Sequence, residues 1–224
     1  MKKNEILKLL YVTKDYPKLR KICSKREDDW CKSVLAKSFF NEENYKEAAK
    51  IFYQQKMFYE SGYCLLLQGD LFNAKRLWMS LDDSTPIIGW GKSLIGFIEK
   101  NPVKTPTYFQ IRNFLEQDLD ALLRANLISY AENVINSIDV MAQVNSESYK
   151  YMARVLFNHN YFDIAKNFLN QSKEIYYKDP ETHFLLGKIH LEKGNFDEAK
   201  NALEAAIEVN EGYFPAKKLL AKLK

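Results

Sequence analysis

The feature that most constrains the fold of this chain is a sequence motif that recurs every 34 residues in its C-terminal half. Residues 160–169 (NYFDIAKNFL) and 194–203 (GNFDEAKNAL) are identical at six of ten positions. A further step of 34 residues leads to 126–135, where Ala131 takes the place of Ala165 and Ala199. A period of this length is typical of repeat proteins, in which each unit buries its apolar face only against its neighbours. We therefore expect an array of similar units.

Each unit is predicted to contain two helices. In the last unit, residues 181–192 carry apolar side chains at helical spacing, and Pro180 suits the first turn of such a helix. Gly194 can adopt the left-handed backbone that ends a helix. The second helix is expected over 197–209, where the repeated small residue Ala199 lets the two helix backbones approach closely.

The N-terminal half carries weaker copies of the same pattern. Residues 44–52 and 69–78 match the start of a second helix, but residues 86–124 do not follow the motif and are either a divergent repeat or a break. The chain has only 8 Gly and 6 Pro in 224 residues, which favours long helices over a sandwich or barrel of short strands. The sequence therefore predicts an all-α protein with no sheet.

One segment divides the two halves. Residues 101–107 (NPVKTPT) contain two prolines and interrupt the helical pattern, so they are the best candidate for a linker. We expect degenerate helical repeats over 1–100 and regular 34-residue repeats with a terminal capping helix over 108–224.

The last unit, residues 180–213, resembles the tetratricopeptide-repeat family. The residues that carry the resemblance are Leu186, Gly187, His190, Gly194, Phe196, Ala199, Leu203 and Ala206. The resemblance implies a helix–turn–helix solenoid, a right-handed superhelix that is degenerate in the N-terminal half. It also implies a non-catalytic scaffold or adaptor that binds a partner peptide or helix in a concave groove and needs no cofactor.

In this family the groove is lined mainly by first helices, at positions not used for packing. The groove residues predicted on this basis are Lys150, Arg154, Phe157, Phe184, Lys188 and Leu191. Together they suggest a basic, aromatic surface for an acidic or amphipathic segment of another protein, and the alternative is an unoccupied, solvated face. We expect neither Lys150 nor Arg154 to be a packing position.

No pattern in the sequence indicates catalysis, a metal or a cofactor. Gly91-Lys92-Ser93 lacks the first glycine of a phosphate-binding loop, because Pro86 stands at that position. His183 and His190 are seven residues apart, whereas paired histidine ligands on a helix are usually four apart. We therefore expect no enzyme activity, no cofactor and no metal site.

Charge supports a second hypothesis. Residues 1–26 carry nine Lys or Arg and two acids, a local charge of +7, while the remainder carries −3. The basic end could bind RNA or an anionic membrane surface, or form a solvated helix face. The near-neutral net charge of +4 weighs against this hypothesis, and we do not expect nucleic acid to be the partner. The three cysteines suggest buried thiols in a reducing compartment, and no apolar run is long enough to span a membrane. We expect a cytoplasmic protein and leave self-association open.

Overall fold

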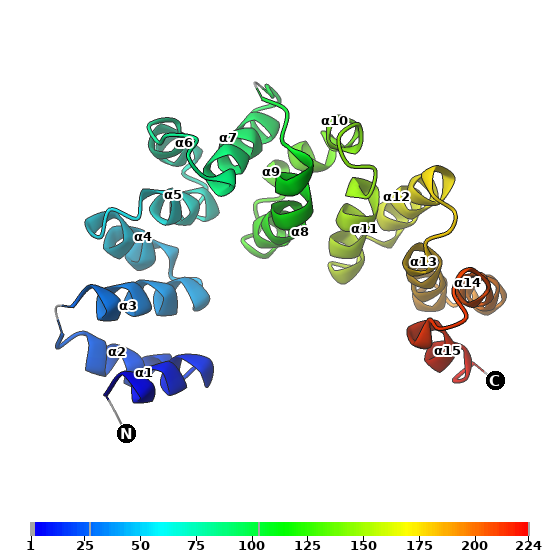
Figure 1. Cartoon of the computed structure of the whole chain (residues 1–224), viewed down its shortest axis with the longest axis horizontal. Helices are drawn as coiled ribbons and strands as arrows, with labels where there is room; N and C mark the ends of the chain where they lie inside the picture. The colour runs from blue at the N-terminus through cyan, green and yellow to red at the C-terminus, as the bar shows by residue number, and fades with distance from the viewer. Residues whose placement is uncertain (1–2, 27, 103, 224) are drawn as a thin grey trace. The chain divides into compact units, whose positions relative to one another are not determined.

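The computed structural model describes residues 3–26, 28–102 and 104–223, and within them it contains fifteen helices and no strand (Figure 1). The all-α prediction is confirmed. The chain forms two compact units, which we call unit 1 (Met1–Ile95) and unit 2 (Gly96–Lys224). In each unit, helices pack mostly against their neighbours in the sequence, as a helical-repeat solenoid requires. The boundary lies inside one helix, and the predicted division at a 101–107 linker stays a prediction.

The helices of unit 1 are α1 (Lys3–Val12), α2 (Tyr16–Cys23), α3 (Asp29–Asn41), α4 (Tyr45–Gln54), α5 (Phe58–Leu67), α6 (Leu71–Met79) and most of α7 (Pro86–Ile98). Those of unit 2 are α8 (Tyr108–Arg124), α9 (Ile128–Ile135), α10 (Ile138–Ala142), α11 (Ser148–Asn158), α12 (Phe162–Ile175), α13 (Pro180–Glu192), α14 (Phe196–Val209) and α15 (Phe214–Leu220).

The turns inside the helix pairs of unit 2 repeat with the period of the sequence. Asn126, Asn160 and Gly194 have φ angles of 56°, 64° and 73°, and each stands two residues before the next helix begins. They are 34 residues apart. Glycine adopts this left-handed conformation without strain, and asparagine tolerates it better than most residues. The predicted role of Gly194 in ending a helix is therefore confirmed, and the same turn occurs in three helix pairs of unit 2.

The core of unit 2 follows the same period. Ala131, Ala165 and Ala199 are fully buried on α9, α12 and α14, the second helices of three successive pairs. Gly187 on α13 shows why small residues are needed, because a Cβ atom there would lie 2.9 Å from two carbons of the Leu203 side chain. Close approach of paired helices thus accounts for the recurrence of small residues.

The pair over 112–145 departs from the motif in an unexpected place. Residues 86–124 do not follow the motif, yet α8 is a regular 17-residue helix. The interruption is in the second half, between α9 and α10, where the Ser137 hydroxyl donates to the Asn133 carbonyl at 2.9 Å. Serine side chains that bond back to the preceding turn weaken helices, and the repeat motif contains no sign of such a bond.

Unit 1 is built around aromatic side chains and small residues. Ala48 and Ala74, from the two weaker copies of the motif, are fully buried on α4 and α6. The Trp78 indole is also fully buried, and its Nε1 donates to the Tyr59 carbonyl at 2.9 Å. Gly62 leaves room for the indole ring, since a Cβ atom there would lie 2.5 Å from Trp78 Nε1.

The three cysteines, Cys23, Cys31 and Cys64, are free and buried, as expected. Burial raises the pKa of Cys31 and of Cys64 to about 12. At neutral pH both are protonated thiols, which are poor nucleophiles and poor metal ligands.

Candidate functional site

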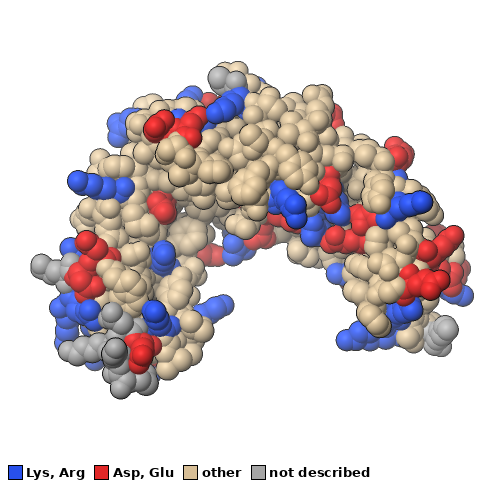
Figure 2. All heavy atoms as spheres, viewed as in Figure 1, with Lys and Arg blue, Asp and Glu red and all other residues tan. Residues whose placement is uncertain are grey.

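The predicted groove residues lie on two neighbouring helices of unit 2. Lys150, Arg154 and Phe157 are on α11, and α11 packs against both α8 and α13. Phe184, Lys188 and Leu191 are on α13. Residues three and four apart share one face of a helix, so each group of three lies on a single face of its helix. We call the surface formed by α8, α11 and α13 the first-helix face. Figure 2 shows Lys and Arg beside Asp and Glu over this part of unit 2.

Three of the predicted residues meet in what we call the aromatic–lysine cluster: Phe157, Phe184 and Lys188. Lys188 Nζ lies 4.3 Å from the centre of the Phe157 ring and 5.9 Å from that of Phe184. An ammonium group at such distances is attracted by the negative face of the ring. Phe184 also packs edge-on against Tyr213, with ring centres 5.7 Å apart. The structure thus joins two consecutive repeats through one cation and two rings.

All three side chains of this cluster are half-buried, so each still presents some surface to solvent. Lys188 makes no ion pair with any of the residues described. Leu191, the remaining predicted residue on α13, is half-buried three residues further along the same helix face.

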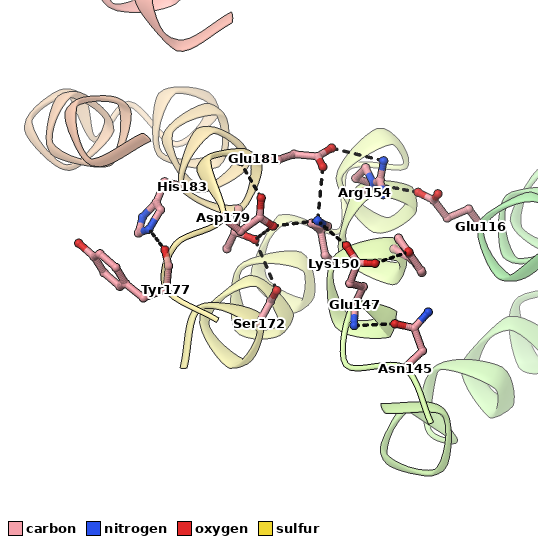
Figure 3. Close-up of polar contacts among 12 residues, drawn as sticks. Glu116, Asn145, Glu147, Lys150, Arg154, Ser172, Tyr177, Asp179, Glu181 and His183 are labelled. Carbon is pink, nitrogen blue, oxygen red and sulfur yellow. Dashed lines mark hydrogen bonds and ion pairs between the residues drawn. The ribbon is translucent and has the colours of Figure 1, made fainter. Parts of the chain in front are cut away.

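Lys150 occupies a different environment from the one expected. Its side chain is 9% exposed, and its Nζ lies 2.8 Å from Asp179 Oδ2 and 3.1 Å from Glu147 Oε1 (Figure 3). A third carboxylate oxygen, from Glu181, lies at 3.6 Å. Lys150 is therefore a buried member of an ion-pair network, which corrects the expectation that it takes no part in packing.

Arg154 belongs to the same network. Its Nε lies 3.0 Å from Glu116 Oε1 on α8, and one of its terminal nitrogens lies 3.3 Å from Glu181 Oε1 on α13. The guanidinium carbon also lies 5.3 Å from the centre of the Tyr151 ring. Arg154 thus ties the first helices of three successive pairs together, as Figure 3 shows.

The charge of this network is opposite to the prediction. Four carboxylates, from Glu116, Glu147, Asp179 and Glu181, surround two cations, from Lys150 and Arg154. The first-helix face was expected to be basic, but here its acids outnumber its bases. Three cationic residues were predicted for the groove: Lys150, Arg154 and Lys188. Of these three, Lys188 lies outside the network.

The carboxyl groups respond to burial and to the cations in different ways. Burial raises the pKa of Glu116 above its ordinary value, against the attraction of Arg154. Burial also acts to raise the pKa of Asp179, but hydrogen bonds from Lys150 and from the Thr182 hydroxyl outweigh it, and the pKa ends below its ordinary value. Asp179 is therefore held as a charged partner of Lys150.

One protein-family model matches part of the chain. Residues 180–213 match the tetratricopeptide repeat model, and they span α13, α14 and the turn at Gly194. This segment is similar to one tetratricopeptide repeat. A search of curated proteins gives no match.

Solved structures of tetratricopeptide-repeat and related proteins are similar only at a distance. The Cut9–Hcn1 complex of APC/C is 13% identical with a TM-score of 0.40, and the match covers 97% of this chain but only 48% of that one. TTC0263 of Thermus thermophilus is 17% identical with a TM-score of 0.41, covering 88% and 98%. YrrB, described as having an unusual peptide-binding site, is 13% identical with a TM-score of 0.37, covering 91% and 96%. At these scores the similarities carry no conclusion about this chain.

The 34-residue frame relates the acids of the network to one another. Glu147 and Glu181 are 34 residues apart, at the start of successive first helices, and both contact Lys150. Glu116 is 34 residues before Lys150. This recurrence of acids was available in the sequence. Asp179, at the start of α13, contacts Lys150 across 29 residues, and no period in the sequence predicts that pairing.

The expectations about metals and membranes concern the titratable side chains and the apolar helices. Within the described parts of the chain, no three His, Cys, Asp or Glu side chains gather closely enough to bind a metal ion. His183 instead contacts the Tyr177 carbonyl oxygen at 2.8 Å. No helix among the described residues combines the length and the apolar character needed to cross a membrane.

Proposed function

We propose that unit 2 is a non-catalytic interaction module that binds a segment of another protein across the first-helix face. Tetratricopeptide repeats generally serve as interaction scaffolds, and the match over 180–213 supports that general role. The observation that carries the proposal is the aromatic–lysine cluster. Lys188 is a cation without an acidic partner among the described residues, and it stands between two partly exposed rings from consecutive repeats.

The chemistry of this cluster favours an amphipathic partner. Aromatic side chains, phenylalanine included, are enriched at protein interfaces, so Phe157 and Phe184 are suited to hold an apolar side chain. A carboxylate on the partner would pair with Lys188. The excess of acids around Lys150 and Arg154 repels further negative charge, so the partner should carry its acid at Lys188 and not beside the network.

The ion-pair network has a supporting part in this proposal. Lys150 and Arg154 are engaged with Glu116, Glu147, Asp179 and Glu181 and fix how α8, α11 and α13 lie against one another. The partner therefore meets a surface that is ordered before binding, which lowers the entropy cost of association.

The alternative, binding of RNA or an anionic membrane through residues 1–26, has less support. Lys18, Arg20 and Arg26 each pair with a carboxylate inside unit 1, which reduces the charge available to a polyanion. That hypothesis and the cytoplasmic location stay predictions.

Charge reversal at one exposed contact tests the proposal. The full-length chain, its Lys188→Glu variant and a Lys200→Glu control would each be used as bait in the native cell, with partners quantified by mass spectrometry. Lys200 is an exposed lysine on the second helix α14 of the same repeat. Loss of a contact worth about 1.4 kcal/mol weakens binding about tenfold, so partners should be depleted by about that factor with Lys188→Glu only. Equal recovery with all three baits would contradict the proposal.

A further inference from the structure

A pocket of about 310 Å³ opens on the first helices of unit 1, far in sequence from the aromatic–lysine cluster of unit 2. It is lined by Tyr11 of α1, Lys37, Phe40 and Asn41 of α3, Phe52 of α4, and Tyr59, Glu60 and Tyr63 of α5. Five of these eight side chains are aromatic rings. A concave, mostly aromatic surface with a few polar groups is typical of ligand-binding pockets.

The aromatic side chains of this pocket pack against a buried tryptophan. Tyr59 stacks on the buried Trp78 with ring centres 5.0 Å apart, and Tyr63 lies 6.4 Å from Tyr59 in a parallel orientation. Phe40 continues the row at 6.0 Å from Tyr63. Gly91 leaves space for this arrangement, because a Cβ atom there would lie 3.0 Å from both Trp78 and Tyr59.

On the α1 and α3 side of the pocket, the Asn41 side-chain amide links two tyrosine hydroxyls. Asn41 Nδ2 donates to the Tyr11 hydroxyl at 3.1 Å and to the Tyr16 hydroxyl at 3.0 Å. The Tyr11 and Tyr16 rings also pack edge to face. Side chains ordered in advance lose little entropy when a ligand binds, so the pocket is preorganised.

The charged residues around the pocket determine which apolar ligands it favours. Lys37 is exposed on the pocket wall, and Lys8 is exposed three residues before Tyr11, on the same face of α1. Neither lysine forms an ion pair with a residue that the structure describes. Glu60 on α5 is the acid among the lining residues. Unit 1 as a whole has 17 basic and 12 acidic residues, a charge of +5.

We propose that this pocket is a second binding site, which takes an aromatic or large aliphatic side chain from an acidic peptide segment of another protein. The apolar side chain would stack on the row formed by Phe40, Tyr63 and Tyr59. Carboxylates beside it would pair with Lys37 and Lys8, on the α3 and α1 side, and avoid Glu60 on the α5 side. The site is independent of the function proposed for unit 2.

Three synthetic peptides test both parts of this proposal. The first has an acetylated Asp-Asp-Phe-Asp-Asp sequence with an amidated end, the second has alanine in place of phenylalanine, and the third has lysine in place of every aspartate. Binding to the full-length protein would be measured by NMR from the aromatic resonances of Tyr11, Phe40 and Tyr63. We expect the first peptide to shift these resonances in a saturable way and the other two to bind at least about fivefold more weakly, a loss of roughly 1 kcal/mol.

Matched variants locate the contact. Lys37→Glu should weaken binding of the first peptide by about threefold or more, as expected for loss of an exposed ion pair and its replacement by repulsion. Lys50→Glu makes the same charge change at an exposed position of α4, away from the pocket lining, and should leave binding unchanged. Lys188→Glu, in unit 2, should also leave it unchanged, which separates this test from that of the proposed function.

The proposal is overturned if the first peptide causes no shift up to about 5 mM, a concentration that would reveal a free energy of binding of only about 3 kcal/mol. It is also overturned if the alanine or lysine peptide binds as tightly, or if Lys37→Glu and Lys50→Glu behave alike. Tyr63→Ala removes part of the wall and should abolish the shifts in Tyr11 and Phe40. Retained binding by a Tyr63→Ala protein whose helical circular dichroism is unchanged would contradict the assigned pocket.

Discussion

At Gly194 the backbone conformation alone restricts the choice of residue. Its φ angle is +73°, and a Cβ atom placed there would meet nothing within 4 Å. Gly194→Ala therefore introduces backbone strain without a clash, and we expect the free energy of unfolding to fall by about 1–2 kcal/mol. Urea denaturation followed by circular dichroism measures this change.

Glu43 provides the reverse experiment. It is exposed and has a φ angle of 60°, so it carries the strain that glycine avoids. Glu43→Gly removes that strain but gives the unfolded chain more freedom, and we expect a net gain of up to about 1 kcal/mol. If Gly194→Ala and Glu43→Gly lower the free energy of unfolding equally, the left-handed backbone at these turns does not favour glycine.

Lys150 shows how burial reverses an expectation drawn from the sequence. Because its side chain is 9% exposed and pairs with Asp179 and Glu147, Lys150→Glu would bury a further carboxylate among acids. We expect a loss of about 3–5 kcal/mol in stability, the usual cost of breaking a buried ion pair. Lys188→Glu, measured in the same way, should change stability by less than about 1 kcal/mol. Equal stability of both variants would contradict the structural role of Lys150.

The pH dependence of stability tests the Lys150–Asp179 pair separately. Since Asp179 has a lowered pKa in the folded chain, its pair with Lys150 stabilises the fold at neutral pH and is lost as pH falls through that pKa. The stability difference between wild type and Asp179→Asn should be full at pH 7 and shrink below about pH 4, the ordinary range of an aspartate pKa. Urea midpoints at pH 7, 5 and 3 measure it. A difference that stays constant with pH would exclude a role for the charge.

Individual site residues could be predicted from the sequence only in part. Phe157, Phe184 and Lys188 do come together, because the 34-residue frame aligns successive first helices. Lys150 and Arg154 share those helix faces, yet their partners come from other helices, and helical periodicity contains no information on such pairings. The acids that recur with the repeat were the one usable signal.

At the scale of helices, the spacing between paired helices governs which residues fit. Ala165 and Ala199 are fully buried on the second helices α12 and α14. Ala165→Leu and Ala199→Leu should each lower the free energy of unfolding by about 1–3 kcal/mol through overpacking. Ala216 on the terminal helix α15 is also fully buried, and Ala216→Leu should show a similar loss.

An exposed alanine serves as the control for these substitutions. Ala221, just after α15, is exposed, and Ala221→Leu should leave the denaturation midpoint nearly unchanged. Equal, negligible shifts for all four variants would contradict the claim that helices pack closely at Ala165, Ala199 and Ala216.

Element boundaries were predictable where glycine, proline or a capping residue marked them. The helix expected over 181–192 is α13, and that expected over 197–209 is α14, each within one residue. The break between α9 and α10 was missed, because no glycine or proline marks it in the sequence. Left-handed turns at Lys14, Glu43 and Lys56 were missed for a similar reason, since these residue types do not indicate such a backbone.

At the scale of the whole chain, charge and aromatic content differ between the two units. Unit 1 has a net charge of +5 and an aromatic pocket, while unit 2 has a net charge of −1 and a network in which acids exceed bases. The two proposed sites, one on each unit, therefore lie in surroundings of different charge.

The most direct test of the interaction role is site-specific photocrosslinking in the native cell. A photoreactive amino acid at Leu191 would report on the first-helix face of α13, and one at Phe196, which is 64% exposed at the start of α14, would report on a second helix of the same repeat. We expect a discrete crosslinked protein from position 191 that is absent from position 196 and is lost when Lys188→Glu is added. Crosslinks of equal yield from both positions, or none from position 191, would contradict a partner-binding surface formed by α8, α11 and α13.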